Sequence, residues 1–371
     1  MKIGIDARMY RSSVAGIGRY SQNLIKNLLE IDKENQYVLF MTDEDYWEFK
    51  NPKSKCQMPN EISNVKVQIT NIPHFSLSEQ TKLPKVLAKE NLDLMHFLNF
   101  NYPVRYKGKF ISTIHDLTLF FYPDTAQKTN FFKKYAFKYV MEKACQNSEK
   151  IIAVSESTKK DIIKKLKVQN SKIKVVYEAA DDKRMDRGRD RVRENKEKII
   201  LYVGQFRPHK NLPNLVDAFE LVRKEISAKL VLLGKADASC VERIDNSSEK
   251  RDIIMPGFVS NDELASWYKK ADIFVFPSFY EGFGLPGLEA MQAGTAVVAS
   301  KASSLPEIYK DAALYFDPFK PEEIADKIKM VLKDNKLQAR LIKNSQKVLK
   351  QYSWRKTAEE TLKVYKEAKS L

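Results

Sequence analysis

Apolar and polar positions along the chain alternate in blocks that predict a strand, then a helix, then another strand. The run MKIGIDARM is a short apolar block typical of a buried strand in a parallel sheet, and the apolar residues between Tyr20 and Ile31 follow at helical spacing. Similar strand blocks are expected at residues 37–42, 65–70, 92–97, 109–116, 150–155 and 172–177. Because helical segments separate most of these blocks, the pattern predicts a parallel sheet with crossover helices.

A highly polar stretch, DDKRMDRGRDRVRENKEK, interrupts this alternation at residues 181–198. The alternation then restarts, with strands expected at residues 199–204, 230–234, 253–259, 273–278, 295–300 and 313–317. We therefore predict an α/β protein with two doubly wound, Rossmann-like domains: residues 1–178, a linker at 179–198, residues 199–351, and a last helix at 352–371. Such sheets bind ligands beyond the carboxyl ends of their strands, so two domains facing each other would enclose one cleft.

The formal net charge is +16, and the surplus is concentrated in residues 1–178, where 29 Lys and Arg stand against 19 Asp and Glu. Lysines alternate with apolar residues at helical spacing in 131–143 and 157–174, which suits an amphipathic helix on an anionic membrane surface. Lysine-rich solvated helix faces give the same pattern, so both interpretations stay open. Neither segment contains a nucleic-acid recognition motif, and nucleic acid is not expected as a partner.

The chain shows no apolar run near the ~18 residues of a membrane span and passes from Met1 into a strand-like segment without a signal-peptide pattern. Cys56, Cys145 and Cys240 lie far apart and form no ligand pair, which fits a reducing compartment. We therefore expect a cytoplasmic protein, with peripheral attachment to the inner face of the cell membrane as a further option.

The motif GIGRY opens the first helix directly after the first loop. Gly16 and Gly18 would let a ligand approach the backbone at a helix N-terminus. A dinucleotide fingerprint would require a third glycine, but Ser21 stands in its place. The motif therefore indicates a nicotinamide or flavin site, a plain tight turn, or a ligand-facing loop of another kind.

Two further strand ends carry candidate polar residues. His115 ends the strand KFISTIHD, where an imidazole would bond a sugar hydroxyl or, alternatively, a neighbouring carbonyl as a structural histidine. In VGQFRPHKN, Gly204 frees the backbone while Arg207 and Lys210 precede a helix. Cations beside a helix N-terminus form an anion site that suits a diphosphate, although loop cations are also common on surfaces.

The stretch EGFGLPGLEA places Glu281 in a glycine-rich loop and Glu289 about one turn into a short helix. Carboxylates bind vicinal hydroxyls, and the backbone N–H groups of Phe283, Gly284 and Leu285 would reach phosphate or sugar oxygens. A ligand with a sugar at each end and phosphate between them, a nucleotide sugar, satisfies all of these groups.

Metal and hydrolase chemistry find little support in the sequence. Asp43, Glu44 and Asp45 form a DxD pattern, but they lie in what looks like an acidic surface turn, and no serine stands in a GxSxG motif. We expect no metal site.

The segment DIFVFPSFYEGFGLPGLEAMQAGTAVVASKASSLPEI resembles the signature of the family-4 retaining glycosyltransferases, including two glutamates seven residues apart. GIGRY, TIHDLTLFFYP, AVSESTKKDI, YVGQFRPHKNL and YSWRKTAEETLKVY follow the family's usual order, so the resemblance covers nearly the whole chain. It implies the GT-B fold, with an acceptor-binding domain at 1–178, a nucleotide-sugar-binding domain at 199–351 and a last helix that crosses back to the first domain. Gln205 departs from the family pattern, which often has arginine at this position.

The resemblance also implies roles for individual residues. Glu289 would hold the ribose hydroxyls and Glu281 would lie by the donor sugar, while Lys210, with Arg207, would neutralise the departing diphosphate. Gly16 would face the same phosphates. His115 would contact the transferred sugar. Further donor-binding positions would be Gly204, Phe283, Gly284 and Leu285, and the acceptor-binding positions would be Gly18, Arg19 and Tyr20.

The expected enzyme is a retaining, metal-independent hexosyltransferase that needs no cofactor beyond a GDP- or UDP-linked sugar, with mannose as the first candidate. The basic helices favour a glycan or lipid-linked acceptor of the cell envelope. Two alternatives are a nucleotide-sugar epimerase on the same scaffold and a non-catalytic basic protein that binds membrane or nucleic acid. The sequence does not determine the oligomeric state.

Overall fold

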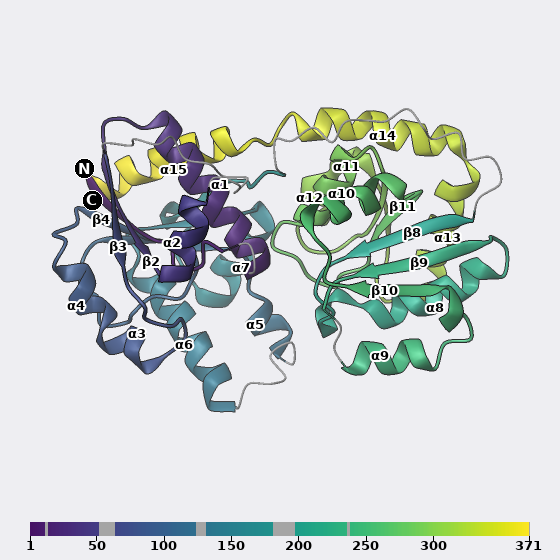
Figure 1. The fold of residues 1–371 in the computed structure, drawn as a ribbon, viewed down its shortest axis with the longest axis horizontal. Coiled ribbons are helices and arrows are strands. Elements are labelled where there is room, and N and C mark those ends of the chain that lie inside the picture. The colour runs from purple at the N-terminus through teal and green to yellow at the C-terminus, as the bar shows by residue number, and fades with distance from the viewer. Residues whose placement is uncertain (12–13, 52–63, 124–130, 181–196, 236–237, 371) are drawn as a thin grey trace. The chain divides into compact units, whose positions relative to one another are not determined.

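The structure is a computed structural model that describes all residues except 12–13, 52–63, 124–130, 181–196, 236–237 and 371. The chain separates into two compact units (Figure 1). The first comprises Met1–Phe120, Ala126–Ala179 and Ser353–Leu371, and the second comprises Phe121–Thr125 and Ala180–Tyr352. Most of the expected linker, 179–198, lies outside the described residues.

The first unit is built on a seven-stranded parallel sheet with the order β3-β2-β1-β4-β5-β6-β7. Its strands are β1 (Lys2–Asp6), β2 (Gln36–Met41), β3 (Val65–Ile69), β4 (Leu94–Phe97), β5 (Phe110–Ile114), β6 (Lys150–Ala153) and β7 (Ile173–Val175). The helices between these strands are α1 (Ala15–Ile31), α2 (Asp43–Lys50), α3 (Leu77–Thr81), α4 (Leu83–Ala88), α5 (Thr118–Phe121), α6 (Phe131–Asn147) and α7 (Glu156–Leu166).

The second unit has a six-stranded parallel sheet with the order β10-β9-β8-β11-β12-β13. Its strands are β8 (Lys198–Val203), β9 (Ala228–Leu233), β10 (Ile253–Gly257), β11 (Ile273–Phe276), β12 (Ala296–Ser300) and β13 (Ala313–Phe316). Its helices are α8 (Leu212–Arg223), α9 (Ala238–Asp245), α10 (Asn261–Lys270), α11 (Leu285–Gln292), α12 (Leu305–Tyr309), α13 (Pro321–Lys333) and α14 (Asn335–Leu349). Each strand expected from the sequence is present, and the prediction of two doubly wound parallel sheets is confirmed.

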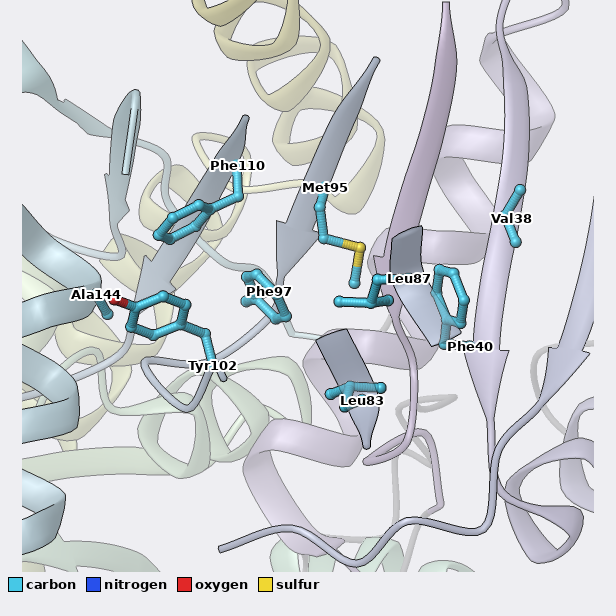
Figure 2. Close-up of a cluster of buried hydrophobic side chains, with 9 residues drawn as sticks. All are labelled: Val38, Phe40, Leu83, Leu87, Met95, Phe97, Tyr102, Phe110 and Ala144. Atoms are coloured by element: carbon cyan, nitrogen blue, oxygen red, sulfur yellow. The ribbon is translucent and has the colours of Figure 1, made fainter. Parts of the chain in front are cut away.

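Alternate residues of β4 face opposite sides of the first sheet, as strand geometry requires. Met95 and Phe97 belong to a buried cluster that packs against α4 and α6 (Figure 2). The cluster consists of Val38, Phe40, Leu83, Leu87, Met95, Phe97, Tyr102, Phe110 and Ala144. Tyr102 stacks on Phe110 with 4.7 Å between ring centroids, which fixes the loop that follows β4.

The other side of β4 is covered by α15 (Trp354–Lys369), the last helix of the chain, which runs beside α1 (Figure 1). The Tyr365 hydroxyl lies 2.8 Å from Nδ1 of His96, and the Thr357 hydroxyl donates to the Tyr177 carbonyl at 2.7 Å. Trp354 is fully buried and packs edge-on against Tyr20. The end of the chain is therefore part of the core of the first unit.

Candidate active site

The second sheet reverses its strand order between β8 and β11, and two loops with candidate residues follow these neighbouring strands. Gly204 directly follows β8, and Arg207 and Lys210 come a few residues later. Arg207 is exposed, and its Nε donates to Oε1 of Gln205 at 2.9 Å. The glutamine at the position where the family often has arginine therefore orients the neighbouring arginine side chain.

Asn211 connects this loop to two others. It begins α8 in the left-handed conformation, with φ of 60°. Its side-chain amide donates to the carbonyls of Pro277 and Pro318, at 3.0 and 2.7 Å, and is buried. Since these carbonyls follow β11 and β13, Asn211 fixes the position of Lys210 relative to the loop that carries Glu281.

Glu281 is the centre of a hydrogen-bonded cluster. Its Oε1 accepts hydrogen bonds from Nζ of Lys210 and from the Ser278 hydroxyl, both at 2.6 Å. Its backbone N–H donates to the Ser303 hydroxyl at 3.1 Å, and its carbonyl accepts from the Ser304 hydroxyl at 3.0 Å. The structure thus brings together two of the residues singled out in the sequence, Lys210 and Glu281, and holds the glutamate by both backbone and side chain.

The N-terminus of α11 is shaped by Tyr309, which reaches over from α12. Gly284 caps α11 with φ of 98°, and its carbonyl accepts a hydrogen bond from the Tyr309 hydroxyl at 2.5 Å. A Cβ on Gly284 would lie 2.5 Å from that hydroxyl oxygen, so only glycine fits. Phe283, just before the cap, is buried and packs edge-on against Tyr352, and Leu285 is the first helical residue. Pro286 in the first turn and Gly294 just after α11 agree with the short helix expected from the sequence.

Glu289 lies one turn into α11 and is held by a partner from another helix. The hydroxyl of Tyr268, on α10, donates to its Oε2 at 2.8 Å, and the tyrosine ring is fully buried. Glu281 in the loop and Glu289 on the helix have separate partners, and their places match those expected from the sequence.

His209 stands between the two cations of this loop and stays neutral. Burial, followed by the charges of Lys210 and Arg207, lowers the pKa of His209 to about 2. Its backbone carbonyl accepts from the N–H of Phe279 at 2.8 Å, which joins the loop after β8 to the loop after β11. The positive charge of this region therefore comes from Lys210 and Arg207.

In the first unit, the glycines of GIGRY differ in their surroundings. Gly16 is exposed on α1, and a Cβ there would meet nothing within 4 Å. A Cβ on Gly18 would lie 2.0 Å from the Arg11 carbonyl oxygen, so close packing alone accounts for this glycine. Arg19 is half-buried, and its carbonyl accepts from the Asn23 side chain at 3.0 Å. Packing therefore explains Gly18 but leaves Gly16 unexplained.

The expectation that Tyr20 contacts an acceptor needs correction, because its side chain is fully buried. Its hydroxyl lies 3.1 Å from that of Thr113, and its ring meets the His115 ring edge-on with 4.7 Å between centroids. Tyr20 supports His115 and is not a contact residue at the surface.

Both ring nitrogens of His115 are bonded inside the first unit. Nδ1 lies 2.9 Å from Oε1 of Glu178, and Nε2 lies 2.9 Å from the Leu98 carbonyl oxygen. Burial alone would lower the pKa of His115, but the hydrogen bond and charge of Glu178 raise it above its usual value. Two acceptors around one ring favour the imidazolium form, in which both nitrogens donate. The alternative of a structural histidine bonded to a carbonyl describes this geometry, and a contact with a sugar through nitrogen would break one of the two bonds.

The acidic residues of the DxD pattern, expected in a surface turn, lie in the first turn of α2. Thr42 caps this helix, and buried Asp45 accepts from the Arg11 backbone N–H at 3.0 Å. Burial raises the pKa of Asp45 above its usual value. The run therefore stabilises a helix start and the neighbouring loop.

Asp6, His74 and Glu79 are the one group with the spacing of metal ligands in the part of the chain that the structure describes. The Arg8 guanidinium lies against both carboxylates, with Nη2 2.7 Å from Oδ2 of Asp6 and 2.7 Å from Oε1 of Glu79. Arg8 already occupies one oxygen of each carboxylate and offsets part of the negative charge that would attract a cation. The donor set is thus that of a buried ion-pair network.

Several residues that complete these clusters were missed by the sequence analysis. They are Ser278, Ser303, Asn211, Tyr268 and Tyr309 in the second unit, and Glu178 and Thr113 in the first. Only the positions of Ser278 and Glu178 just after strands offered a signal, because strand ends are where these sheets present side chains.

Comparison with known protein families agrees with this arrangement. A family model described as glycosyl transferases group 1 matches residues 185–348, and one described as glycosyltransferase family 4 matches residues 14–184. The chain belongs to the family-4 glycosyltransferases of the GT-B fold. Together the two models account for nearly all of this glycosyltransferase.

Curated relatives of this glycosyltransferase include O-antigen chain mannosyltransferase B of Escherichia coli, which is 27% identical over 99% of this chain and 100% of the relative. O-antigen chain mannosyltransferase RfbU of Salmonella typhimurium is 26% identical over 82% of this chain and 84% of the relative.

Solved structures share the fold of this glycosyltransferase at low sequence identity. Sucrose-phosphate synthase of Thermosynechococcus elongatus has a TM-score of 0.76 at 19% identity, covering 99% of this chain and 98% of that one. Anabaena Alr3699/HepE in complex with UDP-glucose has a TM-score of 0.72 at 16% identity, covering 99% of both chains.

Proposed function

We propose that this glycosyltransferase moves a hexose, with mannose as the first candidate, from a nucleotide sugar to a glycan acceptor in polysaccharide synthesis, with retention of configuration and without a metal. The observation that carries the proposal is the cluster at the carboxyl ends of β8 and β11, where Glu281 accepts hydrogen bonds from both Lys210 and Ser278. Two relatives named as O-antigen mannosyltransferases support mannose and a glycan acceptor. A solved neighbour in complex with UDP-glucose supports a nucleotide-sugar donor and keeps a UDP-linked sugar open.

Each residue of the cluster has a task that follows from its charge. When a donor binds, the Lys210 ammonium exchanges Glu281 for the diphosphate, and Glu281 becomes free to accept a hydrogen bond from a sugar hydroxyl. Exposed Arg207 adds a second cation to the leaving group. Glu289, held by Tyr268, accepts from the ribose hydroxyls. A cation already fixed where negative charge develops is the largest contribution that such a site makes to the rate.

Retention follows from attack on the face that the leaving group vacates. The bond between the anomeric carbon and the phosphate oxygen breaks while the acceptor oxygen bonds to that carbon from the same side. The acceptor proton passes to the departing phosphate oxygen, so no enzymic nucleophile is needed. Lys210 and Arg207 supply the positive charge that a divalent metal supplies elsewhere. His115, bonded at both nitrogens, contributes a fixed charge in this scheme.

The deciding experiment is a thermal-shift screen with GDP, UDP, GDP-mannose, UDP-glucose, UDP-galactose and UDP-GlcNAc. A ligand that binds the folded state alone raises its stability, so the donor is the nucleotide sugar that raises Tm most, and GDP or UDP identifies its nucleotide. NMR of the product of that donor, in the presence of EDTA, then reports the anomeric configuration and the need for metal. An inverted product, or activity abolished by EDTA and restored by Mn²⁺, would contradict the proposal.

Peripheral attachment to an anionic membrane forms part of the same proposal. No described helix is long and apolar enough to cross a bilayer. Helix α6 exposes Tyr135 and Tyr139, 69% and 44% accessible, and Lys143 lies over the Tyr139 ring. Exposed aromatics beside lysines suit an anionic interface. Co-sedimentation with phosphatidylglycerol vesicles should fall for Tyr135→Ser and stay unchanged for Trp47→Ser, an equally exposed aromatic on α2.

A further inference from the structure

Phe75 has an unusual backbone and an exposed ring. Its φ is 57°, a left-handed conformation that is costly for a bulky residue, and its side chain is 43% accessible. Strained residues of this kind persist only where the surrounding structure holds them, and they cluster at functional sites. The conformation therefore raises the question of what holds Phe75 and what its ring contacts.

A buried ionic network holds the backbone in place. The N–H of Phe75 donates to Oε2 of Glu79 at 2.8 Å, and Arg8 bonds Oε1 of the same carboxylate at 2.7 Å. Arg8 also donates to the Ile72 carbonyl at 2.9 Å. Because Arg8 and Glu79 are both fully buried, the loop from Ile72 to Phe75 is fixed by groups that solvent does not weaken.

Two further aromatic rings meet Phe75, and they come from different parts of the chain. The Phe137 ring, on α6, lies 4.8 Å from the Phe75 ring between centroids, and the Phe100 ring lies 6.0 Å away. Phe75 follows β3 and Phe100 follows β4, so these rings gather at the carboxyl edge of the first sheet. Ligands bind at this edge in parallel α/β sheets. The three rings are partly exposed, and we call them the aromatic platform.

The polar groups around Phe75 suit a ligand with hydroxyl groups. Arg8 is fully buried and donates hydrogen bonds to Asp6, Glu79 and a carbonyl, so its charge is not available to a ligand. His74, beside Phe75, has a buried Nε2 without a partner in the described part of the chain, and Asn99 precedes Phe100. Aromatic faces with a few polar groups suit a pyranose ring, whose C–H groups are attracted to the negative face of an aromatic ring.

We propose that Phe75, Phe100 and Phe137 form a platform that binds a pyranose ring of the acceptor glycan. The proposal rests on the proposed function and deepens it, because it names the surface that recognises the acceptor and the class of group that it takes. Bound there, the acceptor gains affinity from a part of its chain other than the reacting hydroxyl.

The test measures oligosaccharide binding without a donor. Saturation-transfer NMR of the full chain with an α-linked mannotriose and with maltotriose should detect one of them. Phe75→Gly removes the ring while glycine accepts φ of 57°, so this variant should fold and bind the sugar about ten-fold more weakly. Phe75→Tyr keeps the ring and should bind as the wild type does. Trp47→Ala removes an exposed aromatic elsewhere in the same unit and should change nothing.

Three results would overturn the platform: no binding of either sugar by the wild type, unchanged binding by Phe75→Gly, or equal losses for Phe75→Gly and Trp47→Ala. Loss of phosphatidylglycerol vesicle binding by Phe75→Gly with sugar binding intact would assign the rings to lipid and also overturn it. Failure of the proposed function is seen separately, because the thermal-shift screen measures nucleotide-sugar binding in the absence of any acceptor glycan. With the donor established, Phe75→Gly should raise the acceptor KM about ten-fold and leave kcat unchanged.

Discussion

The Lys210 ammonium and the Glu281 carboxylate lie 71 residues apart in the sequence and meet with 2.6 Å between Nζ and Oε1. Their side chains are only 18% and 11% accessible. An ion pair this far from solvent holds both groups in one geometry before any ligand arrives. In the proposed reaction, a diphosphate would therefore meet a cation that has already lost most of its water, and binding would replace one negative partner with another.

Lys210→Ala should abolish most of the transfer activity. Removing a preorganised charge at the leaving group should lower the transfer rate by about 10²–10³. The measurement is nucleoside diphosphate release with donor and acceptor, alongside Tm to confirm folding. Lys229→Ala is the matched control, because Lys229 pairs with Glu197 at 3.0 Å on a more exposed surface of the same unit. A rate within two-fold of the wild type for Lys210→Ala would refute the role of this lysine.

Tyr268→Phe should weaken nucleotide binding without unfolding the second unit. The change removes the hydroxyl that orients the Glu289 carboxylate and keeps the buried ring. A hydrogen bond to a charged group contributes about 2 kcal/mol, so calorimetry should show a Kd increase of ten-fold or more for the preferred nucleotide. Tyr315→Phe, which removes a hydroxyl bound to the Lys310 carbonyl, should leave Kd unchanged. If both variants bind alike, Glu289 does not contact the nucleotide through this geometry.

Two glycine substitutions separate packing from ligand contact. Gly284→Ala should lower the stability by more than about 1 kcal/mol, because the backbone is left-handed and the new methyl would meet the Tyr309 hydroxyl. Gly16→Ala should leave stability unchanged or slightly higher, since its site is open and helical. Urea unfolding measures both. If Gly16 faces the donor phosphates, Gly16→Ala should also raise the donor KM. An unchanged KM would show that Gly16 does not contact the donor.

Glu178→Gln should change how stability depends on pH. The pKa of His115 is raised in the folded state, so its stabilisation is fully present below the unfolded value of about 6.5 and is lost as pH rises through the folded pKa. The variant should therefore be less stable than the wild type by about 2 kcal/mol at pH 6, and the difference should shrink at pH 9. Asp116 and His96 also act on this ring, so NMR titration of His115 is needed beside urea unfolding. A difference that grows with pH would contradict the ion pair.

The sequence was sufficient to predict both sheets, because buried parallel strands are uniform apolar blocks and most of them are followed by a helix. It also placed Lys210 and Glu281 in loops after strands, and Glu289 one turn into a short helix. What it could not provide was the partners of the site residues. Tyr268 reaches Glu289 from another helix. Tyr309 bonds the Gly284 carbonyl and Glu178 bonds His115, again from elements that periodicity does not bring together. The burial of Tyr20 could not be predicted for the same reason. The ring of His115 and Trp354 of α15, which cover the tyrosine, are distant from it in the sequence.

Helix α15 follows the whole second unit in the chain, yet it supplies Trp354 and Tyr365 to the core of the first. A ribosome makes residues 1–179 first, and chains generally fold from the N-terminus as they emerge. The side of β4 that carries His96 therefore stays uncovered until α15 has been synthesised, after every residue of the second unit. A chain cut before Trp354 would therefore lack the side chains that complete the core of the first unit, although nearly every other residue of that unit is present.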